Sequence, residues 1–420
     1  MIAEKVLTTA VKGLGAWDKG MNLDEILDDV SRGKEKEYRS KVSSILFTYF
    51  RNKAYIDYVI DSLVNRKIEP VVRKIISVAL VQIFFQDGVA KEVAVDVAVN
   101  HVRKLRNRKT GGFVNAVLRN AIRGAFDKAG LNAPDYVKNN VPDLLLKRWN
   151  KSFSMEEVHK VIDVIKKQAP FTFRLLKPVD MSILHDCNCT TVENLSWCGK
   201  FLFYKTDRLD LILKTDLIDS GAIYIQDPAT AMAPCLIDKN KSQRVLDICA
   251  APGGKTLMLS ELCRDAEVVA MDRSVRRLER VTENIKRTQR NNIVIVAADA
   301  LNPPFEKNSF DIVFADVPCS NTGVIRRRPD VVWRFTQKHL NEIVKLQMNI
   351  IESASGLVKT GGVLAYSTCS IEKEENSNQL DKFLFHNKNF EFVKDRLLLP
   401  SEENDGAYGA ILKKSSDFDT

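Results

Sequence analysis

The strongest constraint on the fold is a series of short apolar segments in the second half of the chain. Each has four or five residues, and apolar residues at helical spacing fill most of the intervals between them. Near-continuous apolar strands that alternate with helices are typical of a parallel sheet covered on both faces. Residues 226–420 are therefore predicted to form an α/β, Rossmann-like domain with a mostly parallel sheet. The expected strands are Val245–Ile248, Val268–Met271, Ile293–Val296, Phe310–Phe314 and Gly362–Tyr366, with Tyr408–Leu412 as a last edge strand.

Two further regions precede this domain. Residues 1–128 have apolar side chains at intervals of three and four throughout, interrupted by Pro70 and Asp87-Gly88, which predicts an all-α domain. Residues 129–225 combine turn-forming residues, helical stretches and short extended segments such as Phe171–Leu175. We expect this region to be a linker with a small α+β subdomain, so the chain as a whole is multidomain.

The charge of the chain is concentrated in the helical third. The formal net charge is +9, and residues 1–130 contain 23 basic and 15 acidic residues. The most basic stretch is Arg103–Lys109, with five cations in seven residues. A basic terminal module favours a polyanionic partner, and we expect this stretch to contact an RNA backbone in a salt-sensitive manner.

Membrane and secreted classes do not fit the sequence. The longest apolar run, Ile75–Phe85, is shorter than the roughly 18 residues of a membrane-spanning helix. The first residues have no hydrophobic signal core, and eight cysteines without one indicate reduced thiols. We therefore expect a cytoplasmic protein with no membrane partner.

Ligands of open parallel sheets bind beyond the carboxyl ends of the strands, so the residues there are the candidate site. The first strand leads into Cys249–Thr256, which places two adjacent glycines before a helix. Backbone N–H groups of such a turn can approach a ligand closely. A phosphate-binding P-loop would require glycine at position 249, and no G-x-G-x-x-G is present. A glycine turn used only for tight packing is the alternative.

Acidic residues follow the second and third strands. Asp272 is placed to accept hydrogen bonds from ribose hydroxyls, and Asp299 to meet an adenine edge. Either acid alone could be a helix cap or a solvated turn. Together after a glycine loop they predict an adenosine-shaped pocket, for which S-adenosylmethionine fits better than a triphosphate, because nothing nearby would hold a metal and three phosphates.

Two cysteines follow later strands. Cys319 lies three residues after Asp316, and Cys369 follows the strand Gly362–Tyr366. A lone cysteine is more often a small core residue, but two at neighbouring strand ends favour chemistry. Carbon 5 of cytosine is not nucleophilic until a group adds to carbon 6, and a thiolate is well suited to that addition. The sequence thus predicts cytosine-C5 methylation, with Asp316, Cys319 and Cys369 as catalytic candidates.

These residues resemble a known family. The runs Cys249–Thr256, Asp316–Ser320, Gly323–Arg334 and Tyr366–Ser370 are similar to the NOL1/NOP2/Sun family of RNA cytosine-C5 methyltransferases. Gly112–Arg119 resembles the NusB-type RNA-binding domain. This pairing is similar to that in bacterial Sun/Fmu-type enzymes, so the resemblance implies methylation of 16S ribosomal RNA by a monomeric enzyme that turns the target base out of its stack.

The resemblance also implies roles for individual residues. Cys369 falls at the position of the nucleophile, Cys319 at that of the cysteine that helps release the product, and Asp316 steadies the base. The Thr368-Cys369 pair favours RNA over DNA as substrate. The expected contacts to S-adenosylmethionine are Cys249, Ala250, Ala251, Pro252, Gly253, Gly254, Lys255, Asp272, Asp299 and Asp316.

Two positions depart from the family pattern. Arg174-Leu175-Leu176 stands where the family usually has Arg-x-Asn, so any contact from that asparagine is missing here. Asn321 stands where a small residue is commoner, close to the substrate cysteine.

Other features have a functional and an ordinary interpretation. Arg326-Arg327-Arg328 is either a phosphate clamp beside the flipped base or a solvated charge run. Cysteines 187, 189 and 198 near His185 match no standard zinc spacing, so we expect reduced thiols and no metal. Two rival functions remain: an RNA-binding assembly factor that kept a methyltransferase scaffold, and an enzyme that acts on transfer RNA or DNA.

Overall fold

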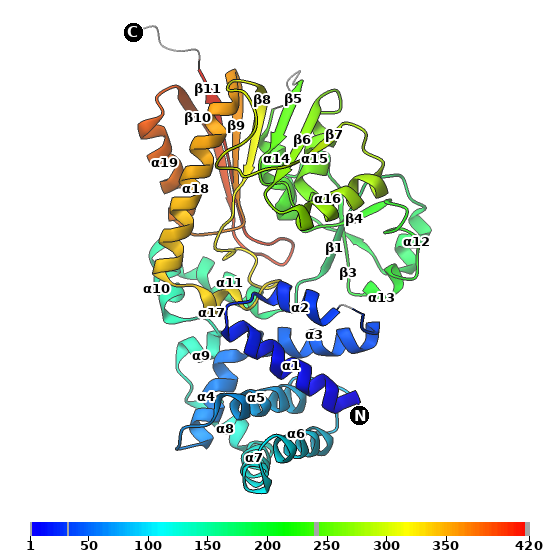
Figure 1. Cartoon of the computed structure of the whole chain (residues 1–420), viewed down its shortest axis with the longest axis vertical. Coiled ribbons are helices and arrows are strands. Elements are labelled where there is room, and N and C mark those ends of the chain that lie inside the picture. The colour runs from blue at the N-terminus through cyan, green and yellow to red at the C-terminus, as the bar shows by residue number, and fades with distance from the viewer. Residues whose placement is uncertain (1, 32, 239–242, 416–420) are drawn as a thin grey trace. The chain divides into compact units, whose positions relative to one another are not determined.

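The computed structural model describes residues 2–31, 33–238 and 243–415 (Figure 1). Residue 1 of the expected first domain and residues 416–420 of the expected last domain therefore lie outside the described residues. The chain forms two compact units. One unit comprises Met1–Ser154 with Ile325–Arg334, and the other Met155–Val324 with Phe335–Thr420. The first unit therefore extends past the expected boundary at residue 128, and most of the expected middle region clusters with the α/β domain.

The first unit is helical, as the apolar spacing predicted. Its central helix is α5 (Pro70–Phe84), in which ten of fifteen residues are buried. Proline at its first position costs no hydrogen bond, because that N–H has no partner within a helix. Helices α1, α3, α4, α6 and α7 pack around α5. The helices of this unit are α1 (Ile2–Asp18), α2 (Leu23–Ser31), α3 (Lys36–Arg51), α4 (Lys53–Leu63), α5, α6 (Lys91–Leu105), α7 (Arg108–Asn120), η1 (Ala121–Ala125), α8 (Phe126–Leu131), α9 (Asp135–Asn139), α10 (Asp143–Ser152) and α17 (Val331–Arg334).

The segment Ile325–Arg334 is built into this helical unit although it follows the cysteine loop in sequence. Trp333 is half-buried against the helical core and donates its indole N–H to the carbonyl of Phe50 at 3.2 Å. Arg51 donates to the carbonyl of Arg326 at 3.0 Å, and Arg326 itself is only 2% exposed. Of the two interpretations of this arginine run, the solvated one does not hold for Arg326, because its side chain is buried.

The second unit begins with a helix and a small antiparallel sheet of order β2-β3-β1-β4. Arg174 on β1 is fully buried and forms an ion pair of 2.7 Å with Glu261 on a helix of the main sheet. This buried contact explains why the small sheet does not separate as its own unit. Its elements are α11 (Met155–Lys166), β1 (Phe171–Leu175), α12 (Met181–Asp186), β2 (Thr190–Thr191), β3 (Phe203–Thr206), α13 (Leu209–Ile212) and β4 (Ile223–Ile225).

The main sheet has seven strands in the order β10-β11-β9-β8-β5-β6-β7. Five neighbouring strands are parallel, and β11 pairs antiparallel with both β9 and β10. The expectation that residues 408–412 form an edge strand is wrong, because β10, which the apolar pattern did not reveal, covers that edge. The strands are β5 (Arg244–Asp247), β6 (Glu267–Asp272), β7 (Ile293–Ala297), β8 (Phe310–Asp316), β9 (Val358–Thr368), β10 (Phe390–Leu398) and β11 (Ala407–Lys414).

Helices cover both faces of this sheet (Figure 1). Alternate strand residues face opposite sides: Val245 and Ile312 pack toward α14 and α15, whereas Leu246 and Val313 pack toward α18 and α19. Such two-sided burial makes the strands continuously apolar, which is the pattern read from the sequence. The elements on and around the sheet are η2 (Pro228–Ala231), α14 (Met232–Leu236), α15 (Gly254–Leu262), α16 (Val275–Thr288), α18 (Gln337–Leu357), η3 (Lys373–Glu375) and α19 (Ser377–His386).

The chain reverses its direction across the sheet between β5 and β8. From β5 the strands continue on one side as β6 and β7, and from β8 on the other side as β9. Ligands of doubly wound sheets bind at the carboxyl ends of the strands beside this switch point. The candidate site is therefore at the ends of β5 and β8.

Candidate active site

Carboxylates mark the carboxyl ends of four adjacent parallel strands. Asp247, Asp272 and Asp316 are the last residues of β5, β6 and β8, and Asp299 follows β7 by two residues. The strand order β8-β5-β6-β7 places these four ends along one edge of the sheet. The acids that the sequence suggested as a group thus share that edge.

The glycine loop between β5 and α15 is closely packed. Gly253 precedes α15 with φ of 104°, a left-handed conformation that favours glycine. A Cβ atom on Gly254 would lie 2.8 Å from the side-chain amide nitrogen of Gln226 and 3.2 Å from the ring of Tyr224, so these side chains would have to move to admit it. Tight packing, the alternative considered for this turn, is thus part of the reason for both glycines.

Asp272 connects the glycine loop to the start of α16. Its carboxylate accepts the backbone N–H of Ala251 at 3.3 Å and that of Ser274 at 2.9 Å. Arg277 lies 3.4 Å from the same carboxylate, which is 5% exposed. Ser274, not Asp272, caps the helix. Asp299 is exposed and accepts the N–H of Leu301, so its conformation is that of the solvated turn.

Asp247 is a buried acid to which the sequence reasoning assigned no role. One of its oxygens accepts the hydroxyl of Thr256 at 2.7 Å, and the other has no hydrogen-bond partner among the described residues. Burial raises the pKa of Asp247 to about 7, and the negative charge of Asp316 adds to this effect. A buried oxygen without a partner at a strand end is available to a ligand.

The two strand-end cysteines are in contact. Cys319 Sγ lies 2.9 Å from Cys369 Sγ, and the backbone N–H of Cys369 donates to Cys319 Sγ at 3.3 Å. The parallel pairing of β8 and β9 sets Asp316 opposite Ser367, which brings the two loops to the same place. The two cysteines that the sequence placed at neighbouring strand ends therefore lie in contact.

The neighbourhood of the thiols keeps Cys319 neutral and places a cation near both cysteines. The contact with Cys369 and burial raise the pKa of Cys319 well above its usual range, so Cys319 retains its proton. Lys255 forms an ion pair of 2.6 Å with Asp316. Burial lowers the pKa of Lys255, but Asp316 and the two cysteines outweigh burial and raise it. Lys255, expected as a contact of the cofactor, is therefore a permanent cation beside the reactive groups.

A buried glutamate joins the two cysteine loops. Glu375 is completely buried and accepts the backbone N–H of Ser320 at 2.8 Å, together with the Ser320 hydroxyl. It also accepts the hydroxyl of Ser370 at 2.6 Å and the amide of Gln347 at 2.9 Å. Ser320 and Ser370 directly follow the two cysteines. Sequence reasoning missed Glu375, because an acid in Glu374-Glu375-Asn376 gives no local sign that it is buried.

Other close contacts fix the turn at Cys369. Asn376 accepts the hydroxyl of Thr368 at 2.7 Å and donates to the carbonyl of Ser370 at 2.9 Å. Gly323 donates its N–H to the carbonyl of Cys369 at 2.9 Å, and a Cβ atom on Gly323 would meet that carbonyl at 2.8 Å. The backbone on both sides of Cys369 is therefore held by hydrogen bonds.

Cys249 differs from this pair. Burial raises the pKa of its thiol, with further contributions from Asp247 and Asp316, so it remains a neutral thiol. Its place in the loop after β5 is compatible with a contact to a ligand rather than with nucleophilic attack.

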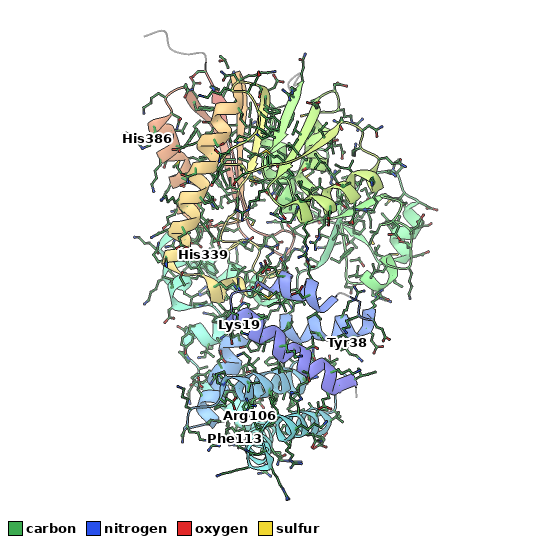
Figure 2. The ribbon with its side chains drawn as sticks, viewed as in Figure 1. Lys19, Tyr38, Arg106, Phe113, His339 and His386 are labelled. Atoms are coloured by element: carbon green, nitrogen blue, oxygen red, sulfur yellow. The ribbon has the colours of Figure 1, made fainter. Side chains whose placement is uncertain are left out.

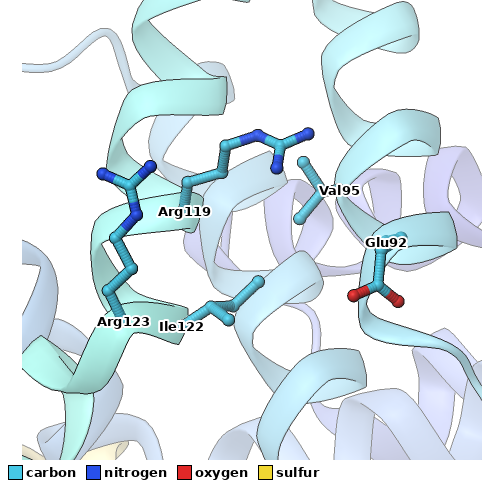
Figure 3. Close-up of a pocket in the computed structure, with 5 residues that line it drawn as sticks. All are labelled: Glu92, Val95, Arg119, Ile122 and Arg123. Carbon is cyan, nitrogen blue, oxygen red and sulfur yellow. The ribbon is translucent and has the colours of Figure 1, made fainter.

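The helical unit carries an exposed basic surface. Every residue of Arg103–Lys109, at the end of α6 and the start of α7, is exposed (Figure 2 labels Arg106). Lys104 and Arg106 form ion pairs with Glu4 and Glu69. A pocket of about 90 Å³ lies between α6 and the helices that follow, lined by Glu92, Val95, Arg119, Ile122 and Arg123 (Figure 3).

Neither a metal centre nor a membrane span is found in residues 2–31, 33–238 and 243–415. Within these ranges no three histidine, cysteine or acidic side chains are grouped so that they could hold a metal ion. Cysteines 187, 189 and 198 are free thiols. Over the same residues, each helix is too short or too polar to cross a bilayer.

Comparisons with known proteins match both units. Residues 234–411 match the family described as 16S rRNA methyltransferase RsmB/F, and residues 5–123 match the NusB family. Ribosomal RNA small subunit methyltransferase B of Vibrio vulnificus is 29% identical over 422 residues, which cover 95% of this chain and 96% of that protein. The protein of the same name from Escherichia coli K12 is 28% identical, with 94% of this chain and 96% of that protein covered.

Two solved structures share the fold. The crystal structure of PH0851 has a TM-score of 0.77 at 23% identity and covers 98% of this chain and 99% of that one. The structure of NSun6 from Pyrococcus horikoshii with SFG has a TM-score of 0.56 at 20% identity, over 66% of this chain and 99% of that one.

Proposed function

The chain joins a NusB-family region to a region of the 16S rRNA methyltransferase RsmB/F family, and from this premise we propose that it methylates carbon 5 of a cytosine in 16S ribosomal RNA with S-adenosylmethionine. The observation that carries the proposal is the contact between Cys319 and Cys369, 2.9 Å apart at the ends of two adjacent parallel strands. Methylation of a cytosine at carbon 5 requires a nucleophile at carbon 6 and a second group for release, and two thiols at one place can fill both roles.

Cys369 is the proposed nucleophile. Its neighbour Cys319 retains its proton, because burial and the contact with Cys369 raise the pKa of Cys319. The thiolate of Cys369 attacks carbon 6 of the base, and the electron pair of the 5,6 double bond becomes available at carbon 5. Once Cys369 is bonded to carbon 6, its contact with Cys319 no longer raises the pKa of that thiol, and Cys319 gives up its own proton to solvent. After carbon 5 has received the methyl group, the Cys319 thiolate takes the proton from carbon 5, the double bond re-forms and the bond between sulfur and carbon 6 breaks.

Asp316 and Lys255 act on the base in this proposal. Asp316 steadies the ring at N3: the proton that Cys369 gives up on attack passes by way of Asp316 to N3, where negative charge would otherwise develop when sulfur adds to carbon 6. The Lys255 ammonium at 2.6 Å keeps the carboxylate in place and adds positive charge beside both thiols. Preorganised charge of this kind stabilises a transition state without reorganisation during the reaction.

The strand ends on the other side of the switch point fit S-adenosylmethionine. The unpartnered oxygen of Asp247 can accept a hydrogen bond from a ligand amine, and Asp272 lies where ribose hydroxyls bind in comparable folds. The residues that would hold it are Cys249–Lys255, Asp272, Asp299 and Asp316. When bound, S-adenosylmethionine supplies an electrophilic methyl group.

The substrate assignment depends on the helical unit and on the relatives. The exposed basic stretch Arg103–Lys109 suits contact with an RNA backbone. The relatives that match nearly the whole chain are named as methyltransferases of small-subunit ribosomal RNA. We further propose that the protein acts as a monomer in the cytoplasm, that residues 1–128 serve as its RNA-binding domain, and that residues 226–420 are its catalytic domain.

Trapping of the covalent adduct tests this function. Cys319→Ala is incubated with S-adenosylmethionine and a 16S ribosomal RNA transcript and run on a denaturing gel. We expect a protein–RNA band that vanishes when Cys369 is also replaced, and no such band with Cys263→Ala, which removes a thiol elsewhere in the domain. Methyl transfer by Cys369→Ala at the wild-type rate would refute the mechanism. Transfer to a transfer RNA transcript but not to 16S RNA would refute the substrate.

A further inference from the structure

Asn321 lies on the Cys319 loop, and its side chain reaches Cys369 on the other cysteine loop. Its φ is +61°, in the left-handed region that residues other than glycine seldom adopt and that asparagine tolerates better than most. Its side-chain oxygen Oδ1 lies 3.1 Å from Cys369 Sγ, and its Nδ2 donates to the carbonyl of Cys319 at 2.8 Å. One amide therefore contacts both loops.

The orientation of this amide follows from its partners. Nδ2 must face the carbonyl of Cys319, because the opposite orientation would set two oxygen acceptors against each other. Oδ1 then faces Cys369 and can only accept a hydrogen bond. The thiol of Cys369 satisfies this acceptor, whereas its thiolate would be repelled by it. A hydrogen bond made only to the neutral form of a group disfavours the charged form.

We propose that Asn321 is a positioning residue that holds Cys369 as a protonated thiol in the resting enzyme, and so sets the pH range in which this nucleophile becomes available. The assignment of Cys369 as nucleophile rests on the proposed function. Attack requires the amide of Asn321 to release the thiol, which keeps the sulfur unreactive until a substrate base displaces that contact.

Several other groups face Cys369. Cys319 lies 2.9 Å away on the same loop as Asn321, and Glu375 lies behind that loop. The ion pair of Lys255 and Asp316 is also near, and Lys255 interacts electrostatically with both thiols. The positive charge of Lys255 favours the thiolate, and the oxygen of Asn321 opposes it. When Asn321 is replaced, only the effect of Lys255 remains, and the pKa of Cys369 should fall.

Asn321→Gly is the decisive variant. Glycine adopts a φ of +61° without strain, so the loop keeps its shape while the acceptor is lost. Iodoacetamide alkylation of Cys369 is followed between pH 6 and 10 by mass spectrometry of the peptide. We expect the profile to move to lower pH, and a shift of half a pH unit gives about threefold faster alkylation below the pKa. Asn321→Asp should move the profile to higher pH, because a carboxylate disfavours the thiolate.

Two further variants separate the amide from the backbone. Asn321→Ala removes the acceptor but keeps the left-handed strain, and it should shift the profile in the same direction as glycine. Asn194→Gly, at another asparagine with positive φ (58°), should leave the alkylation of Cys369 unchanged. An unchanged profile in Asn321→Gly overturns the proposal. So does a shift that is seen with glycine and not with a folded alanine variant, since strain would then be the cause.

The alkylation assay needs neither RNA nor a methyl donor. A shifted profile in an enzyme that never methylates 16S RNA would leave the role of Asn321 intact and refute only the proposed function. If the enzyme methylates 16S RNA and Asn321→Gly leaves the alkylation profile unshifted, the proposed function stands and the role of Asn321 is refuted.

Discussion

The carboxylate of Glu375 accepts the backbone N–H of Ser320 at 2.8 Å from a completely buried position. Since Ser320 follows Cys319, and the hydroxyl of Ser370, which follows Cys369, also binds Glu375, one carboxylate fixes the residue after each cysteine. The position of each thiol therefore depends on the same buried side chain, which holds the residue after each cysteine.

Replacement of Glu375 should separate the two thiols. In Glu375→Ala the donors of Ser320, Ser370 and Gln347 lose a buried acceptor, and each such loss costs about 1–3 kcal/mol. We expect the free energy of unfolding in urea to fall by about 3 kcal/mol. Glu375→Gln should fold better yet still lower kcat more than it raises KM. Glu374→Gln is the control, and an equal effect there would argue against a specific role for Glu375.

The contact between the thiols predicts a reversible oxidation. Diamide should remove one hydrogen from each of Cys319 and Cys369 and leave a disulfide between them, because the two sulfur atoms are already adjacent. We expect loss of methyl transfer that dithiothreitol restores, and a crosslinked peptide pair in mass spectrometry. In Cys319→Ala the crosslinked pair cannot form. A wild-type enzyme in which diamide links neither cysteine to the other would contradict this geometry.

The raised pKa of Asp247 predicts a pH dependence of stability. Its pKa rises from 3.8 to about 7 on folding, so the folded state binds more protons between these values. The contribution of Asp247 to the free energy of unfolding is therefore fully present below about pH 4, falls as the pH rises and levels off above about pH 7. The total fall is at most about 1.4 kcal/mol for each unit of difference between the two pKa values. Asp247→Asn should flatten this decline. Urea unfolding of the wild type and of the variant at each pH from 4 to 8 measures this decline. If the free energy of unfolding changes with pH equally in both proteins, Asp247 does not titrate in this range.

Lys255 should be needed for the reactivity of Cys369. Lys255→Met removes the positive charge beside Asp316 and both thiols. We expect alkylation of Cys369 to move to higher pH, opposite in sign to Asn321→Gly, and kcat to fall on the order of 100-fold, as for the loss of one positioned catalytic group. Lys286→Met, in the last turn of α16, is the control. An unaltered alkylation profile would indicate that Lys255 serves only to hold a ligand.

The basic stretch of the helical unit should determine how RNA binding depends on salt. Replacement of Arg103, Arg108 and Lys109 by glutamine removes three exposed cations. We expect weaker binding and a slope of log K against log salt that is reduced by about 2 to 3. The control replaces three other exposed lysines by glutamine: Lys345 on α18, Lys382 on α19 and Lys388, two residues after the end of α19. Equal slopes for both triple variants would place the RNA elsewhere.

Several parts of the site could be predicted because they depend on local sequence. The end of each strand could be predicted from the point where an apolar segment stops. This placed Asp272, Asp316 and both cysteines on one edge of the sheet. Glu375 and Asn321 were not assigned roles in this way. Burial of a single polar side chain, and the direction in which it points, depend on partners that other elements supply.

The sequence by itself determined the helical first third, the parallel core of the sheet and the meeting of the two cysteine loops. The first two follow from the periodic burial of hydrophobic residues along each segment, and the third from the rule that the carboxyl ends of parallel strands meet at one edge of a sheet. Only the tertiary structure decided that Ile325–Arg334 packs into the helical unit, that β10 covers the edge beyond β11, and that Glu375 joins the cysteine loops. These features arise from contacts between segments that are distant in the sequence. Such contacts cannot be seen in the apolar periodicity of either segment alone.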